Sequence, residues 1–410
     1  MKLRAMLQTP ITGQSVLRLL PWVIIIFVVG FFYAQIFKHA ETAPYYDDYP
    51  AIFTFLIDFL NGGVADKISA FSALFNEHRP AFTRIVSLAV YSALGSVDMR
   101  VLLFIGNLGL LALAGILYRT FSNQPGKPLY FLPVVFALFQ PQHWENMYWT
   151  MASLQNFWVL VFSFLCLYFI VKPDGLLAAA LFCLLAVFTS GNGLLLIPIG
   201  LIALRRKNAA TVSIWLALGL LIVFAYFAGY PSAGGELRGL IRPLPLVKFF
   251  LCFLGSGFQK SYVPANTPAL LTGLAFVLYF AYLTVARYYR KNPAVYWFTF
   301  FLFASSFLAS VIRSVHGIPT PIASRYMIYS VLLAVCFYTA ICDTQKSGVV
   351  KGILPVILLF AFIFNLWSYT VNRTHIIEFN SDRESFTRNC PGWHNAAEIE
   401  SEAIRLKLIQ

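Results

Sequence analysis

The chain has 410 residues, of which 59% are hydrophobic and only 11% are charged. A soluble domain carries about 25% charged residues, so the composition excludes an ordinary soluble protein and indicates one that is embedded in a membrane. The net charge of +13 is compatible with a nucleic-acid partner, but the basic residues gather in short loops between apolar runs, which favours membrane topology and no nucleic acid. The six cysteines form no disulfide framework.

Apolar runs of nearly membrane-spanning length recur along the whole chain. By the rule of roughly 20 residues per span, they predict about eleven transmembrane helices. The expected spans are 17–37, 101–118, 129–140, 157–171, 176–189, 193–204, 211–230, 268–286, 294–312, 325–342 and 352–370. Two more apolar stretches, 81–94 and 245–258, are short and have basic residues at or inside them. We expect both to stay in the interface or to re-enter without crossing.

The positions of Lys and Arg support that topology. If neither short stretch crosses and the N-terminus is cytoplasmic, the cytoplasmic segments carry 14 basic residues and two acids. If both crossed, Arg205, Arg206 and Lys207 would face outward, against the positive-inside rule. The sequence therefore predicts an all-α polytopic membrane protein, with a transmembrane domain over 1–371 and a short, partly helical outer tail over 372–410. The unusual polar motifs then all face the outer side.

The long first outer segment, 38–100, opens with an acidic pair, Asp47 and Asp48. Pro50 suits the first turn of an apolar helix that can lie along the membrane surface. One interpretation makes Asp48 the N-cap of this helix. The other makes the pair a general base or an ion ligand at the membrane boundary. Since a cap needs only one acid, the second interpretation is favoured, above all for Asp47.

Further along the same segment, Glu77, His78 and Arg79 precede Pro80, which again suits the start of a helix. A guanidinium and an imidazole beside the N–H groups of a helix N-terminus make a suitable seat for a phosphate. The alternative is that these residues merely anchor the segment at the membrane interface.

Another outer loop contains the motif "HWENMYW", residues 143–149. Its aromatic residues, Trp149 among them, form either a simple interfacial belt or a platform on which a sugar ring stacks. In the second interpretation, Glu145 and Asn146 supply hydrogen bonds to the sugar.

Two arginines, Arg313 and Arg325, end and begin neighbouring spans on the outer side, and Tyr326 completes the motif "SRY". Basic residues there run against the charge bias, so they either bind a lipid phosphate or extend toward lipid headgroups. The sequence contains no P-loop, nucleophile elbow or metal-ligand spacing. The outer acids show no pattern that suits an octahedral cation, so we expect no metal and no cofactor.

The layout resembles that of the GT-C superfamily of integral membrane glycosyltransferases. One span is followed by a long outer loop that opens with an acidic pair and carries surface helices, and many further spans follow. The stretches "DDYP", "NEHR", "HWEN" and "SRY" are similar to those of bacterial members that modify surface polysaccharide, and the resemblance covers about residues 15–371. It implies a protein of the bacterial inner membrane with its active face on the periplasmic or extracellular side.

The resemblance also implies the chemistry. The donor is a polyprenyl-monophosphate sugar, and the acceptor is a hydroxyl of a glycan or glycolipid. Asp47 or Asp48 deprotonates the acceptor, which attacks the anomeric carbon with inversion. The leaving phosphate is bound by His78, Arg79, Arg313 and Arg325. The sugar or acceptor is bound by Glu77, Glu145, Asn146, Trp149 and Tyr326.

Two other functions stay open at this point. A transporter or flippase for an anionic lipid-linked precursor could use the same outer arginines, although it would normally carry charge near the bilayer midplane. A polysaccharide polymerase is the closest rival among enzymes.

Overall fold

The structure is a computed structural model that describes residues 13–122, 126–230, 243–261, 266–314, 321–389 and 396–409. Within these ranges the chain is helical and forms no β-strand, apart from one isolated bridge between Phe75 and His78. Eight of the described helices are long and apolar enough to cross a membrane. The all-α class is therefore confirmed, and the eight long helices agree with a polytopic membrane protein.

The helices follow one another with short connections. The first half of the described chain contains α2 (Gly13–His39), the π-helix η1 (Tyr49–Thr54), α3 (Phe55–Asn61), α4 (Val64–Ser72), α5 (Ala81–Leu94), α6 (Met99–Thr120), α7 (Lys127–Leu138), η2 (Pro141–His143), α8 (Trp144–Tyr148), α9 (Thr150–Ala152), η3 (Ser153–Phe157), α10 (Trp158–Ile170) and α11 (Leu176–Val187). The second half contains η4 (Gly191–Leu195), α12 (Leu196–Leu204), α13 (Ala209–Phe227), α14 (Pro243–Gly255), η5 (Ser256–Phe258), α15 (Thr267–Val285), η6 (Tyr288–Arg290), α16 (Pro293–Arg313), α17 (Ser324–Thr344), α18 (Ser347–Asn389) and α19 (Ala396–Arg405).

Three of the eleven expected spans are helices that are shorter than a full membrane crossing. The expected span 129–140 is α7, with 12 residues, and 176–189 is α11, also with 12 residues. The expected span 193–204 is α12, which together with η4 covers only Gly191–Leu204. A straight crossing needs about 20 residues, so the number of eleven crossings stays a prediction.

Local sequence signals explain several helix ends. The Asp98 carboxylate caps α6 by accepting the backbone N–H of Arg100 at 2.9 Å, and the Asn208 side chain caps α13 by accepting that of Thr211 at 2.8 Å. Gly95 ends α5 in the left-handed region at φ 73°, which glycine adopts without a Cβ clash.

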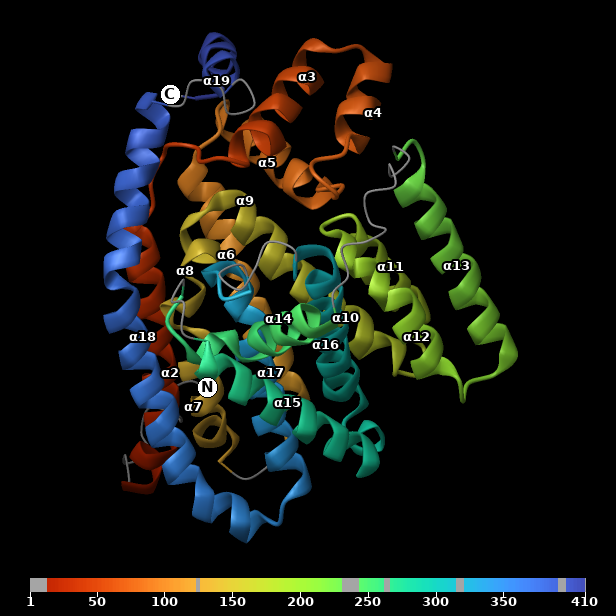
Figure 1. Cartoon of the computed structure of the whole chain (residues 1–410), viewed down its shortest axis with the longest axis vertical. Helices are drawn as coiled ribbons and strands as arrows, with labels where there is room; N and C mark the ends of the chain where they lie inside the picture. The colour runs from red at the N-terminus through yellow and green to blue at the C-terminus, as the bar shows by residue number, and fades with distance from the viewer. Residues whose placement is uncertain are drawn as a thin grey trace, which may run out of the picture.

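The two ends of the helix bundle differ in chemistry. α3, α4, α5 and α19 gather at one end, the upper one in Figure 1. At the opposite end, the Asn292 side chain donates to the Thr120 carbonyl at 2.9 Å and to the Asp343 carboxylate at 2.8 Å. The Arg205 guanidinium lies 5.9 Å from the ring centre of Tyr289. The predicted basic loops therefore meet at one end of the fold, away from the predicted polar motifs.

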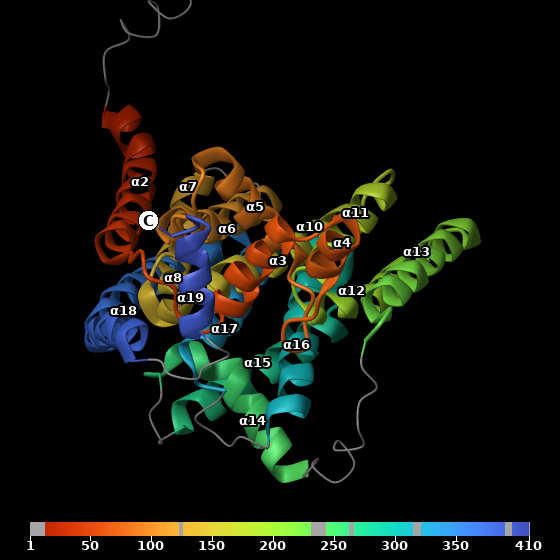
Figure 2. The ribbon, with the colours of Figure 1, turned by 90° about the horizontal axis from the view of Figure 1, so that it is seen from above.

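The two doubtful apolar stretches form short helices, α5 and α14, of 14 and 13 residues. α5 stays at the upper end with α3 and α4, and α14 lies across the front of the bundle (Figures 1 and 2). α14 packs closely on α15 because small residues face each other. A Cβ built at Gly255 would lie 2.0 Å from the Ala269 carbonyl oxygen, so only glycine permits this approach. Both helices are shorter than a straight crossing of about 20 residues, and the expectation that neither stretch crosses stays a prediction.

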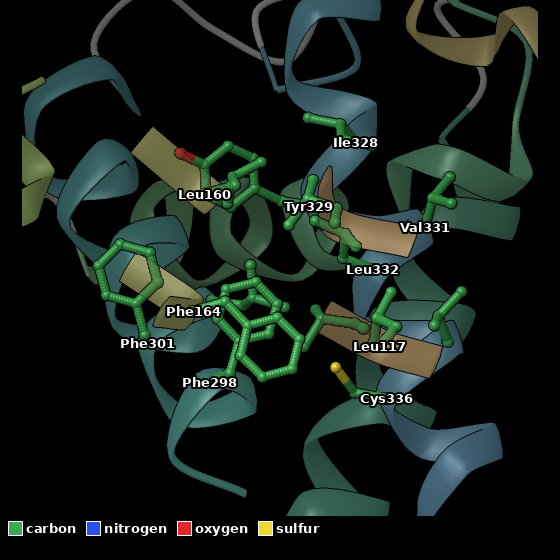
Figure 3. Close-up of a cluster of buried hydrophobic side chains, with 14 of the residues drawn as sticks. Leu117, Leu160, Phe164, Phe298, Phe301, Ile328, Tyr329, Val331, Leu332 and Cys336 are labelled. Atoms are coloured by element: carbon green, nitrogen blue, oxygen red, sulfur yellow. The ribbon is translucent and has the colours of Figure 1, made fainter. Parts of the chain in front are cut away.

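The core lies where α6, α10, α16 and α17 meet, and Figure 3 shows part of it. Phe164 of α10 stacks on Phe298 of α16 with ring centres 4.2 Å apart and planes 4° apart. Leu160, Leu332 and Leu117 are also fully or almost fully buried there. The segment of α3–α5 has its own smaller core around Ile52 and Leu56. The helix bundle thus has a closely packed apolar centre, with the polar residues gathered toward one end.

The C-terminal boundary proposed at residue 371 falls inside a continuous helix. α18 runs for 43 residues, from Ser347 to Asn389, beside α2, and the rings of Phe31 and Tyr369 lie 5.2 Å apart. The described part of 372–410 contains the end of α18 and the short helix α19. Its last part returns to the first outer segment, where the Val97 N–H donates to the Leu408 carbonyl at 2.7 Å.

Candidate functional site

A cavity of about 410 Å³, lined by both charged and apolar side chains, opens between the first outer segment and the adjacent ends of α13, α16 and α17; we call it the main cavity. Seven of the eleven candidate residues line it: Asp47, Glu77, His78, Trp149, Arg313, Arg325 and Tyr326. They come from five separate parts of the sequence. The fold therefore brings together the acidic, basic and aromatic residues whose motifs the sequence had placed on one side.

The two adjacent acids have different surroundings. Asp47 is partly exposed and lines the main cavity. Asp48 is fully buried, and its carboxylate accepts the backbone N–H of Tyr45 at 2.9 Å and that of Met151 at 2.8 Å. Asp48 directly precedes η1, but its side chain makes no capping hydrogen bond to that helix. The interpretation of Asp48 as a side-chain N-cap is therefore wrong. Burial raises the pKa of Asp48 to about 7, against the opposing effects of Arg383 and the two N–H groups.

Arg79 lies outside the lining of the main cavity. Its guanidinium is buried and donates to three backbone carbonyls: those of Tyr226 at 2.7 Å, Ala228 at 2.5 Å and Ser72. These bonds join the end of α4 to the end of α13. Because these donors are already directed at the backbone, the geometry favours a structural role for Arg79 over the expected phosphate binding.

Glu77 and His78 line the main cavity beside Arg313. The Arg313 Nη2 lies 2.9 Å from the Glu77 Oε1, and both side chains are partly exposed. The His78 Nδ1 accepts the backbone N–H of Gly191 at 3.2 Å. Burial lowers the pKa of His78, and Arg313 lowers it further while Glu77 opposes the shift. A neutral His78 can donate from its Nε2, because its Nδ1 is an acceptor here.

Gly191 permits this close arrangement. A Cβ built on it would lie 2.8 Å from the Tyr226 hydroxyl oxygen and 3.2 Å from the His78 Nδ1. The glycine at position 191 of the "SGNG" motif thus lets the backbone approach the His78 imidazole closely.

Glu145 holds Arg325 by two contacts. Its Oε1 lies 2.8 Å from the Arg325 Nη1, and its Oε2 accepts the Arg325 backbone N–H at 2.9 Å. The Asn146 side chain donates to the Arg325 carbonyl at 2.8 Å. The guanidinium lies 5.2 Å from the ring centre of Tyr326. Glu145 and Asn146 are nearly or fully buried and do not line the main cavity, so here they position Arg325.

Several polar residues of the main cavity were not among the sequence candidates. Asn156 donates to the Asn146 side-chain oxygen at 2.8 Å, and Asn192 donates to the Tyr329 hydroxyl at 2.8 Å. Both line the cavity. The sequence did indicate them, because each asparagine interrupts or borders an apolar run, where burying an amide without a hydrogen-bond partner is costly.

A second cavity of about 380 Å³ lies on the other side of Trp149 and Arg325, which line both. Its other lining residues are Tyr45, Tyr46, Trp144, Glu145, His375, Glu378, Phe379 and Asp382. Four of them belong to α18, in the part expected to be a tail. This cavity could not be predicted from the sequence, because it depends on α18 continuing past residue 371.

No protein-family model, curated protein or solved structure matches this chain. Assignment of a function therefore depends on the chemistry of the two cavities.

Proposed function

We propose that the protein is a membrane glycosyltransferase of the GT-C type. It would move a sugar from a polyprenyl-phosphate donor to a hydroxyl of a cell-surface glycan or glycolipid. The observation that carries the proposal is the convergence of a partly exposed acid, Asp47, with Arg313 and Arg325 in one cavity at the end of an apolar helix bundle. Such a position suits a substrate with its tail in lipid and its sugar in water.

In the proposed reaction, the Asp47 carboxylate takes the proton of the acceptor hydroxyl. The acceptor oxygen forms a bond to the anomeric carbon while the bond from that carbon to the phosphate oxygen breaks. The bonding electron pair leaves with the polyprenyl phosphate, and the configuration at the anomeric carbon inverts. A general base of this kind contributes about 10²–10⁴-fold to the rate.

The leaving phosphate gains negative charge as the bond breaks, and preorganised cations stabilise that charge. Arg313 and Arg325 each carry five N–H donors, so one carboxylate partner does not exhaust a guanidinium. Glu77 and Glu145 pair with the two arginines. The phosphate would share or replace those contacts, and a neutral His78 would add a hydrogen bond.

Trp149, Tyr326 and Asn156 line the same space and suit the sugar of the donor. The proposed orientation places this end of the bundle on the outer side of the bacterial inner membrane. The basic loops at the opposite end would then face the cytoplasm, together with the N-terminus, in line with the positive-inside rule.

A transporter or flippase and a polymerase are the rival functions. The test is transfer by the purified protein in liposomes, with short-chain polyprenyl-phosphate sugars as donors and isolated surface glycans as acceptors. The expected result is a glycan heavier by one sugar for each transfer, with release of polyprenyl phosphate. Movement of labelled donor across the bilayer without any new glycosidic bond would support a flippase instead. Repeated extension of one lipid-linked chain would support a polymerase.

A further inference from the structure

We propose that the second cavity is the acceptor-binding site and that it takes a hydroxyl-rich, uncharged glycan; this inference rests on the proposed glycosyl transfer. Five aromatic side chains and three carboxylates line it, those of Tyr45, Tyr46, Trp144, Trp149, Phe379, Glu145, Glu378 and Asp382. Aromatic faces pack on the C–H faces of sugar rings, and carboxylates accept hydrogen bonds from hydroxyl groups. The lining thus offers both kinds of contact that a glycan makes.

The cavity lies next to the proposed base. Tyr46 lines the second cavity, and the next residue, Asp47, lines the main cavity. Tyr46 has a positive φ of 40°, which is uncommon for a residue with a side chain and typical of functional sites. The turn allows consecutive side chains to reach different cavities. A glycan held in the second cavity would have a route past Trp149 to the carboxylate of Asp47.

The aromatic wall is built from separate segments that pack edge to face. The ring centre of Tyr45 lies 5.6 Å from that of Trp149 and 4.8 Å from that of Phe379, and Trp144 lies 5.3 Å from Phe379. The Trp149 indole N–H also donates to the Tyr45 carbonyl at 3.2 Å. These contacts fix the orientation of the rings, which lowers the entropy cost of binding a flexible glycan.

The charged residues of the two cavities favour different substrates. The second cavity contains Glu145, Glu378 and Asp382 against Arg325, and the main cavity contains Asp47 and Glu77 against Arg313 and Arg325. An excess of carboxylates disfavours a phosphate. The anionic donor is therefore directed to the main cavity, which leaves the second cavity to the uncharged acceptor.

The far wall is one face of α18. His375, Glu378, Phe379 and Asp382 recur at spacings of three, four and seven residues, which places them on the same side of a helix. Arg383 anchors this part of α18, because it donates to the Ala43 carbonyl at 2.6 Å and to the Tyr148 carbonyl at 3.0 Å. The continuation of α18 beyond its apolar part thus has a function that the hydropathy of the sequence does not reveal.

The test uses the double variant Glu378→Gln/Asp382→Asn, which keeps the shapes of both side chains. Glu378 is 62% exposed and its contact with His375 is long, at 3.5 Å, so its replacement has little effect on stability. Glu398→Gln is the matched control, since Glu398 is exposed on α19 and lines neither cavity. Thermal unfolding in detergent verifies that both variants fold.

Two measurements are made on each protein. Saturation-transfer NMR, without any donor, tests a fixed panel of neutral trisaccharides built from hexoses, deoxyhexoses or N-acetylhexosamines. Transfer kinetics give separate KM values for donor and acceptor. We expect at least one trisaccharide to bind the wild type, the control and Asp47→Asn alike, and the double variant to lose that binding. We expect its acceptor KM to rise about tenfold or more, with an unchanged donor KM.

Binding by no trisaccharide of the panel, equal binding by the double variant, or an unchanged acceptor KM would each overturn the assignment of the second cavity. The proposed transferase activity fails separately: it fails if no polyprenyl-phosphate sugar is consumed while the trisaccharide still binds. If the double variant transferred sugar with a normal acceptor KM, the proposed activity would stand and only the assignment of the second cavity would fail.

Discussion

Asp47 and Asp48 are neighbours in the chain but lie in opposite surroundings. Asp47 lines the main cavity, whereas the Asp48 carboxylate is fully buried and bound by the backbone N–H groups of Tyr45 and Met151. The second of these bonds connects the first outer segment to the start of the helix that continues as α10. Asp47 therefore faces the cavity, where the proposed function makes it the base, and Asp48 holds the loop that carries both acids.

Asparagine substitutions should separate these two roles. Asp47→Asn should lower the transfer rate by about 10²–10⁴-fold and leave the melting temperature almost unchanged. Asp48→Asn should destabilise the fold by about 1–3 kcal/mol, because an amide NH₂ would face one of the two N–H donors. Transfer rates and thermal unfolding of both variants check this. Wild-type transfer by Asp47→Asn would remove it as the base.

Arg79 and Arg313 should differ in the same way. Arg79→Ala should lower stability on the order of 3 kcal/mol or more, since it leaves three carbonyls without their donor. Arg313→Ala removes only a partly exposed ion pair with Glu77, so the fold should lose about 1 kcal/mol or less. Its donor KM should instead rise about tenfold or more. Arg313→Lys should restore the charge but not a bidentate contact.

Donor KM values and unfolding curves for the three variants are the measurement. A normal donor KM in Arg313→Ala would place the phosphate elsewhere in the main cavity. A stable Arg79→Ala protein with a raised donor KM would return Arg79 to the role that the sequence suggested.

The sequence allowed the helices and the chemical difference between the two ends of the bundle to be predicted, because apolar length and Lys/Arg bias are local properties. It also identified most of the charged residues of the main cavity, since Glu77, Arg313 and Arg325 stand out in an apolar chain. It favoured Asp47 over Asp48 only slightly, and it did not separate Arg79 from Arg313. Those roles depend on burial and on backbone partners from distant segments, such as Met151 for Asp48.

The second cavity could not be predicted from the sequence for the same reason. A fall in hydropathy after residue 371 suggested the end of the domain, but α18 continues to Asn389. Asn365, Ser368 and Asn372 of this helix bind the segment 136–142. The Asn365 side chain donates to the Phe139 carbonyl at 2.9 Å, and that of Asn372 donates to the Gln142 side chain at 2.7 Å. The sequence shows such amides as polar interruptions only, and their partners follow from the fold.

The orientation of the bundle predicts which end reacts with a reagent that cannot cross the membrane. Cysteines at two exposed positions, Ala65→Cys in α4 and Arg206→Cys between α12 and α13, are introduced separately into Cys390→Ser protein. The other native cysteines are buried. In right-side-out vesicles, an impermeant maleimide should label position 65 and not position 206. Labelling of 206 before the vesicles are opened would reverse the orientation and place both cavities on the cytoplasmic side.

His143 predicts a pH dependence of stability. It is fully buried between Phe32 and Phe157, and neither ring nitrogen has a hydrogen-bond partner among the described residues. Burial lowers its pKa to about 3, whereas the unfolded chain has a histidine pKa near 6.5. Below about pH 6.5 the unfolded state therefore binds a proton that the folded state does not, and stability falls by up to about 1.4 kcal/mol per pH unit.

His143→Leu has no such group, so its melting temperature should fall less than that of the wild type between pH 7 and pH 4.5. Asp48 acts in the opposite sense, because its raised pKa stabilises the fold at low pH. It is present in both proteins and cancels in the comparison. If the melting temperatures of wild type and variant fell by the same amount over this pH range, His143 would already be protonated or solvated in the folded state.

The last prediction concerns metal ions. A polyprenyl monophosphate can leave with the help of arginines, whereas enzymes with a diphosphate leaving group often recruit a divalent cation held by carboxylates. Arg313 and Arg325 already bring positive charge to the main cavity. Among the described residues, no three His, Cys, Asp or Glu side chains gather as a ligand set, and Mg²⁺ requires several oxygen ligands in octahedral array.

A cation beside Asp47 would also lower the pKa of that carboxyl and make it a weaker base. Transfer from a polyprenyl-monophosphate sugar should therefore continue at its full rate in excess EDTA, with protein that was dialysed against the chelator. The control is an assay of the same preparation with excess Mg²⁺ or Mn²⁺ added back, where the rate should again be unchanged. If EDTA abolished transfer and either ion restored it, Asp47 would be a metal ligand rather than the base, and a diphosphate donor would become the better assignment.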